Sequence, residues 1–155
     1  MPLPDHPPKN TTSPFASFAG HHVAVRVPDY EAAKAWYTEK LDFRVLAEWP
    51  FGDLQLAYLA PPTDNTFHVE LLAGGDPVMP EITEGLQESL AVGGFHHFCM
   101  RVTSVDDTLA ELRTRGVTVL GEPFEVPDVS SRLAFFRDPW GTRIEISQDL
   151  RRGNR

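Results

Sequence analysis

Two pairs of histidine and glutamate stand at matching positions in this sequence. Glu70 lies 48 residues after His22, and Glu145 lies 48 residues after His97. Two imidazoles and two carboxylates form a mixed nitrogen and oxygen set that suits one divalent metal ion, such as Zn, Ni, Co, Mn or Fe. Four protein ligands leave one or two positions of an octahedral ion open to a substrate. The spacing therefore predicts a metal site capable of catalysis.

Each of these four residues alone has a simpler interpretation. A histidine at the start of a strand is often a half-buried polar residue, and a glutamate between apolar neighbours often marks the solvent face of a strand. The matched spacing of the two pairs favours a metal site. His21 and His96 precede the predicted ligands by one residue, so we expect them to support the ligands or the fold. His68 has no counterpart in the second pair, and we expect it to line the cavity.

The two pairs belong to an internal repeat with an offset of 75 residues, in which residues 20–27 align with 95–102. Both copies continue into a helical pattern. Asp29 is the predicted N-cap of the first helix, which is expected to end near Lys40. Ser104 is the predicted N-cap of the second, which is expected to end near Gly116. Strands are expected at about 43–49, 54–60, 67–72, 117–120, 132–137 and 142–147, with a β-turn at 138–141.

Alternation along these strands separates two faces. Val23, Val25 and Val27 are expected to meet the first helix, whereas His22 and Arg26 point the other way. The closing strands repeat the pattern around Glu70 and Glu145, each flanked by apolar residues. The four predicted ligands, and Arg101 in the second copy, should therefore face one common trough.

The predicted fold class is α+β, with two tandem βαβββ modules forming a curved mixed sheet around a metal-binding cavity. One module is too small to bury both faces of its sheet, so the two should pack side by side. The expected divisions are a flexible proline-rich leader (1–19), a first module (20–73), a connector with a helix near 81–91 (74–94), a second module (95–148) and a basic tail (149–155).

Several motifs resemble the vicinal oxygen chelate superfamily over about residues 20–148. They are His22-Val-Ala-Val-Arg-Val, Glu70-Leu-Leu, His97-Phe-Cys-Met-Arg-Val and Asp138-Pro-Trp-Gly-Thr-Arg-Ile-Glu145. That superfamily contains glyoxalase I, methylmalonyl-CoA epimerase, extradiol dioxygenases and the fosfomycin and bleomycin resistance proteins. The resemblance implies that His22, Glu70, His97 and Glu145 are metal ligands, in the four-ligand order of glyoxalase I. It also implies a substrate-binding role for Arg26, which Arg101 repeats.

The resemblance implies an enzyme that removes a proton next to a carbonyl through a metal-chelated enediolate. We expect a lyase or isomerase acting on a small oxygenated substrate, with Glu145 as principal base and Glu70 returning a proton on the opposite face. Gly74 stands where glyoxalase I has a glutathione-binding asparagine, so glutathione is not expected. The alternatives are an epimerase of a hydroxyketone, cyclitol or acyl-CoA, a ring-cleaving dioxygenase, or a non-catalytic protein that binds a small molecule or antibiotic.

Composition narrows the class of partner. The chain has 155 residues and a formal charge of −8, which argues against nucleic acid as a ligand. No apolar run approaches the roughly 18 residues that span a bilayer, so no membrane partner is expected. The lone Cys99 suits the reducing cytoplasm. We expect a cytoplasmic homodimer, with the site formed either within one chain or across the dimer by module exchange.

Overall fold

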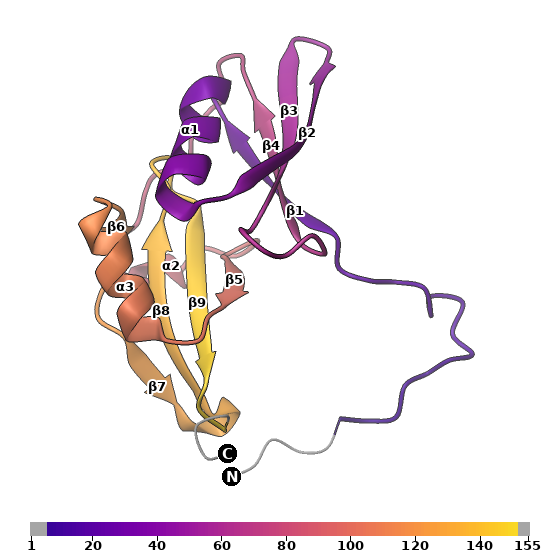
Figure 1. Ribbon diagram of the computed structural model, residues 1–155, viewed down its shortest axis with the longest axis vertical. Helices are drawn as coiled ribbons and strands as arrows, with labels where there is room; N and C mark the ends of the chain where they lie inside the picture. Colours follow the sequence, from indigo (N-terminus) through magenta and orange to yellow (C-terminus); the bar gives the residue numbers. More distant parts are fainter. Residues whose placement is uncertain (1–5, 152–155) are drawn as a thin grey trace.

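The computed structural model describes residues 6–151 and shows a mixed α+β fold with one sheet in each module (Figure 1). The first module contains β1 (His22–Val27), α1 (Tyr30–Leu41), β2 (Arg44–Phe51), β3 (Leu54–Ala60) and β4 (His68–Ala73). A connector with α2 (Leu86–Ser89) leads to the second module. This contains β5 (Phe98–Arg101), α3 (Val105–Thr114), β6 (Thr118–Val119), β7 (Phe124–Val126), the 3-10 helix η1 (Pro127–Val129), β8 (Ser131–Arg137) and β9 (Arg143–Asp149). No helix in this part of the chain is long and apolar enough to cross a membrane.

The two sheets share one topology. Their strand orders are β1-β4-β3-β2 and β5-β9-β8-β6, with β7 pairing β8 outside that path. In each sheet the first strand pairs in parallel with the last, and the other pairs are antiparallel. The predicted α+β fold of two tandem modules is therefore confirmed. β7 was not predicted from the sequence.

Both predicted N-caps are confirmed. The Asp29 carboxylate accepts a hydrogen bond from the backbone N–H of Ala32 at 2.9 Å, and the Ser104 hydroxyl oxygen accepts one from the N–H of Asp107 at 3.1 Å. Each bond satisfies a backbone donor that the first turn of a helix leaves unpaired. The caps fix where each helix begins after its preceding strand.

The predicted connector helix at 81–91 is wrong in length, because α2 covers only Leu86–Ser89. Its N-cap, Gly85, has no side chain to accept a hydrogen bond from the first turn. The apolar stripe that suggested a longer helix is not fully buried, since Ile82 is 40% exposed and Leu90 is 60% exposed. Without a core to pack against, a short amphipathic segment does not extend into a helix.

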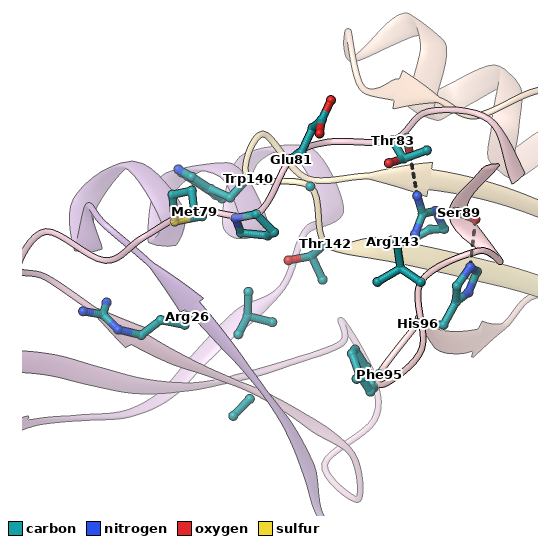
Figure 2. Close-up of a pocket in the computed structure, with 15 residues that line it drawn as sticks. Arg26, Met79, Glu81, Thr83, Ser89, Phe95, His96, Trp140, Thr142 and Arg143 are labelled. Carbon is teal, nitrogen blue, oxygen red and sulfur yellow. Dashed lines mark hydrogen bonds between the residues drawn. The ribbon is translucent and has the colours of Figure 1, made fainter.

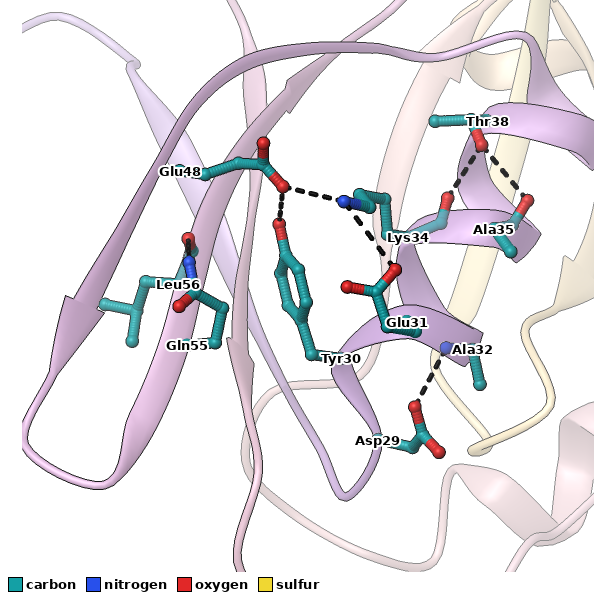
Figure 3. A network of polar contacts seen from close by, with 10 residues as sticks. All are labelled: Asp29, Tyr30, Glu31, Ala32, Lys34, Ala35, Thr38, Glu48, Gln55 and Leu56. Carbon is teal, nitrogen blue, oxygen red and sulfur yellow. Dashed lines mark hydrogen bonds and ion pairs between the residues drawn. The ribbon is translucent and has the colours of Figure 1, made fainter.

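Figure 3 shows how α1 is attached to β2 on the helix side of the first sheet. Tyr30 donates a hydrogen bond from its hydroxyl to Glu48, and the Lys34 ammonium lies 2.8 Å from the same carboxylate. Burial and the neighbouring Glu48 carboxylate raise the pKa of Tyr30, whereas Lys34 and Tyr30 lower the pKa of Glu48. This network orients α1 against the sheet.

One hydrophobic cluster includes the helices and the helix-facing strand residues of both modules. A buried hydrogen bond crosses it: the Tyr37 hydroxyl on α1 donates to Asp138 at 3.0 Å. Asp138 also accepts from the N–H groups of Trp140 and Thr142, and its carbonyl accepts from Gly141 to close the predicted β-turn. Burial raises the pKa of Asp138 and holds that of Tyr37 well above its usual value. The modules are thus joined by a shared core and a specific polar contact.

The shared core determines where the predicted ligands point. Val69 and Leu71 in β4, and Ile144 and Ile146 in β9, are buried in the cluster. Glu70 and Glu145 each lie between two of these buried residues. Because side chains alternate along a strand, both carboxylates are on the sheet face that points away from the cluster. The predicted alternation is confirmed, and each ligand-bearing face is turned away from the core that joins the modules.

Candidate metal centre

Each sheet brings one histidine and one glutamate together. His22 begins β1, which pairs in parallel with β4, and its Nε2 lies 3.3 Å from the Glu70 carboxylate. His97 directly precedes β5, which pairs in parallel with β9, and its Nε2 lies 3.2 Å from the Glu145 carboxylate. The same topology thus builds the same pair twice.

The geometry of each pair fits two neighbouring ligands of one metal ion. Imidazole nitrogen and carboxylate oxygen bind a divalent transition metal at about 2.0–2.2 Å, so two such donors at a right angle lie about 3 Å apart. The separations of 3.3 and 3.2 Å are close to that value. In chemistry and in distance, each pair could supply half of a coordination sphere.

The two halves do not meet within one chain. Among residues 6–151, no group of three or more histidine, cysteine, aspartate or glutamate side chains is placed to hold a metal ion. The reason lies in the packing, because the shared core occupies the helix sides of the two sheets and the pairs lie on the other sides. The four-ligand set stays a prediction, and its completion requires either a second copy of the chain or a different placement of the two modules.

A chain of hydrogen bonds selects the tautomer of His97. The Ser89 hydroxyl lies 2.6 Å from the Leu86 carbonyl, to which it must donate, and its oxygen therefore accepts from His96 Nε2 at 2.9 Å (Figure 2). The other ring nitrogen of a neutral His96, Nδ1, is then an acceptor. It lies 2.8 Å from His97 Nδ1, which donates to it. In a neutral His97, the lone pair is then on Nε2.

The electrostatics support this arrangement. Desolvation, followed by the positive charge of Arg143, lowers the pKa of His96. His96 is therefore neutral at neutral pH, as the chain of hydrogen bonds requires. The lone pair of His97 Nε2 is on the atom that faces Glu145, where a metal would bind. The predicted supporting role of His96 thus has a physical basis.

Replacing Ser89 with alanine is expected to weaken metal binding at the His97 pair by about tenfold or more, because partners that orient a ligating histidine have effects of 10- to 100-fold. Competition titration with a chromophoric chelator measures the affinity. Ser131→Ala is the matched control, since the Ser131 hydroxyl also donates to a nearby backbone carbonyl but touches no histidine. Equal affinities for the two variants would show that Ser89 does not orient the ligand.

Aromatic side chains flank both pairs. In the first sheet, Tyr58 lies opposite Glu70, and its ring centroid is 5.4 Å from that of His22 and 4.7 Å from that of Trp49. In the second, Phe135 lies opposite Glu145, 5.3 Å from the His97 ring. Phe124 stacks on Phe135, and neither was predicted as a site residue. Comparing the strand preceding each glutamate could have identified Phe135 as the counterpart of Tyr58.

The two arginines predicted to bind substrate have different surroundings. The Arg26 guanidinium donates hydrogen bonds to the carbonyls of Val27, Leu72 and Gly74 at 2.6–2.9 Å. It therefore holds the ends of β1 and β4 together. Arg101 is exposed at the end of β5. Their binding roles stay predictions.

Cys99 lies beside Glu145 in the parallel pair of β5 and β9. Partial shielding from water and a hydrogen bond to the Glu145 carboxylate raise the pKa of this thiol to about 12. The thiol is therefore protonated at neutral pH and is a poor nucleophile. Cys99 is therefore not a candidate nucleophile beside the pair of His97 and Glu145.

Known proteins are similar to this chain over most of its length. The profile of the Glyoxalase/Bleomycin resistance protein/Dioxygenase superfamily matches residues 20–146. The 2-epi-5-epi-valiolone epimerase of an Actinomyces species is 29% identical over 143 residues, covering 83% of this chain and 78% of that protein. Human mitochondrial methylmalonyl-CoA epimerase is 27% identical over 157 residues, covering 95% and 88%.

One solved structure has a similar fold, and its sequence identity is comparable to that of the two epimerases. The crystal structure of TnmS3, an antibiotic binding protein from a Streptomyces species, superposes with a TM-score of 0.64 and 28% identity. The match covers 85% of this chain and 96% of that one. The similarities therefore include enzymes and a binding protein on the same architecture.

Proposed function

The chain belongs to the Glyoxalase/Bleomycin resistance protein/Dioxygenase superfamily, and from this premise we propose that it is a metal-dependent lyase or isomerase. Its reaction would begin with removal of a proton next to a carbonyl of a small oxygenated substrate. The observation that carries the proposal is the repeated pair of histidine and glutamate, with donor atoms 3.3 and 3.2 Å apart. A mere binding cavity does not require two such pairs.

The proposed ligands are His22, Glu70, His97 and Glu145. A divalent ion held by them would polarise the substrate carbonyl and lower the pKa of the neighbouring C–H. Glu145 is the proposed base, because its carboxylate lies beside a histidine whose tautomer is fixed. Glu70, on the other sheet, would return the proton from the opposite side. Two carboxylates on two separate sheets suit an epimerase, which must act on both faces of one carbon.

Epimerisation is the favoured form of this reaction. The valiolone epimerase and the methylmalonyl-CoA epimerase are both similar over most of the chain. Gly74, which has no side chain, stands at the position where glyoxalase I has an asparagine that binds glutathione. A hydroxyketone, a cyclitol ketone and an acyl-CoA are the substrate classes to test.

The proposed active form is a homodimer, in which His22 and Glu70 of one copy meet His97 and Glu145 of the other. Two observations support it: neither pair is complete alone, and each lies on a sheet face turned from the core of its own chain. Exposed apolar side chains, Leu90, Val92 and Phe95, precede His97 along the chain. Their burial against a second copy would favour association. The proposed compartment is the cytoplasm, where the free Cys99 would stay reduced.

A second candidate function is sequestration of a small molecule without turnover. The aromatic pairs Trp49–Tyr58 and Phe124–Phe135 favour it, because such surfaces bind planar ligands. The likeness to the antibiotic binding protein TnmS3 points the same way. In that case the glutamates would need no metal.

Solvent deuterium incorporation tests the proposed reaction. Protein purified without chelator is analysed for bound metal, reconstituted with Zn, Ni, Co, Mn or Fe(II), and incubated in deuterated water with members of the three substrate classes. We expect metal-dependent exchange of the proton next to the carbonyl, with loss on chelation and recovery on adding the metal back. Absence of both bound metal and exchange, together with tight binding of an aromatic ligand, would instead establish the sequestering protein.

A further inference from the structure

Two arginines face each other across the hairpin of β8 and β9. Arg137 and Arg143 are directly paired in the antiparallel register, two residues from the pair formed by Phe135 and Glu145. Cross-strand partners share a face of the sheet, so both guanidinium groups lie on the face that carries Glu145. Like charges directly opposite one another are unfavourable unless an anion lies between or beside them.

The connector supplies only partial compensation. The Glu84 carboxylate lies 2.9 Å from Arg137, and Arg143 donates a hydrogen bond to the Thr83 carbonyl. The Nε atoms of both arginines are buried and have no hydrogen-bond partner among the described residues. A buried donor without an acceptor costs about 1–3 kcal/mol, more when charged, so native structures rarely leave two side by side. The Glu84 carboxylate thus pairs with Arg137, whereas Arg143 contacts a neutral carbonyl, and each of the two cations has an unused donor.

A cavity opens beside Arg143, one member of this arginine pair. It has a volume of about 320 Å³ and lies between β1, the connector and the turn before β9 (Figure 2). Arg143 and Arg26 contribute positive charge to its wall, and Glu81 is the acidic residue among those that line it. In a chain with a formal charge of −8, this local excess of positive charge suits a negatively charged ligand.

We propose that Arg137 and Arg143 form a binding site for the anionic group of a small molecule, a carboxylate or a phosphate. Guanidinium groups present paired N–H donors that match the oxygens of both anions. The ligand takes the place of the Glu84 carboxylate, which is 62% exposed and thus bound only weakly to Arg137. Displacement of residues 83–84 gives the ligand access to the buried Nε donors.

The site also restricts the substrate of the proposed reaction. Arg143 precedes Glu145 by two residues on the same face, a separation of roughly 7 Å along a strand. An anionic group held by the arginines would place a carbon a few bonds away beside the Glu145 carboxylate. This part of the inference rests on the proposed function and predicts an anionic substrate, whereas the anion site itself is independent of any metal.

Isothermal titration with inorganic phosphate and with malonate, on chelator-treated protein, tests the anion site. We expect at least one of the two anions to bind, and Arg137→Gln and Arg143→Gln each to weaken binding at least about tenfold, the effect of losing a charged hydrogen bond. Glu84→Gln should strengthen binding several-fold, because the competing carboxylate is gone. The matched controls are Arg132→Gln, on the opposite face of β8, and Glu122→Gln, which has the same charge change as Glu84→Gln. Both controls should bind as the unaltered chain does.

The comparison of phosphate with malonate identifies which anion the site prefers. If neither anion binds, or if Glu84→Gln binds no more tightly than Glu122→Gln, the arginines only anchor the connector and the proposal is wrong. Circular dichroism excludes unfolding of the arginine variants, and Glu84→Gln provides a test that does not depend on them. Anion binding without deuterium exchange would retain this site and reject the proposed reaction; exchange without anion binding would do the opposite.

Discussion

Replacing Glu145 with glutamine is expected to slow solvent deuterium exchange by about 10²- to 10⁴-fold, the usual contribution of a positioned general base. Glutamine retains an oxygen that can approach a metal but cannot accept the proton. The effect should fall on the maximal rate, because the contacts that bind the substrate remain. Exchange is followed by NMR at saturating substrate, alongside the metal content of the same sample.

Glu125→Gln is the control for this substitution, because Glu125 is an exposed carboxylate on the neighbouring β7. It should leave both exchange and metal content unchanged. Glu70→Gln should slow epimerisation more than exchange, because Glu145 can still remove the proton and return a deuteron on the same face. A Glu145→Gln protein with normal exchange and normal metal content would remove Glu145 from the proposed mechanism.

Mixing two inactive variants is expected to restore metal binding and exchange. One variant carries His22→Ala with Glu70→Ala, and the other carries His97→Ala with Glu145→Ala. In the proposed dimer, a mixed pair of chains contains one site with all four ligands and one with none. The mixed dimer should therefore hold about one ion, whereas each variant alone holds none.

Differently tagged chains, co-expressed and purified through both tags, provide the mixed dimer for this measurement. Two tagged copies of the same variant form the control and should stay without metal. If both modules of one chain built the site, every site in the mixed dimer would lack two ligands. Failure to recover any metal in a purified mixed dimer would accordingly overturn the shared site.

Local patterns in the sequence predicted most elements of each module. The alternation of Val23, Val25 and Val27 identified β1, and side-chain acceptors at Asp29 and Ser104 marked the starts of α1 and α3. β7 was missed because glycine and proline surround its three residues and obscure the alternation. The connector helix was overestimated because helical spacing reports an apolar stripe, not whether a core is available to bury it.

In the candidate site, too, contacts within one sheet could be predicted from the sequence, whereas the relation between the two modules could not. Each histidine lies beside its glutamate because alternation and parallel pairing within one sheet bring them together. The relation between the two pairs depends on how the modules pack, which strand patterns do not contain. The arginine pair Arg137 and Arg143 was not predicted either, because it depends on the register of a hairpin rather than on spacing along the chain.

The buried hydrogen bond between Tyr37 and Asp138 makes the two halves of the repeat different from each other. At the repeat offset of 75, the counterpart of Tyr37 is Leu112 and the counterpart of Asp138 is Thr63, so neither half carries both partners. A tandem of two first halves would lack the carboxylate acceptor, and a tandem of two second halves would lack the tyrosine donor. The two halves are therefore not interchangeable: the repeat is seen in the spacing of the predicted ligands but not in the bond that joins the modules.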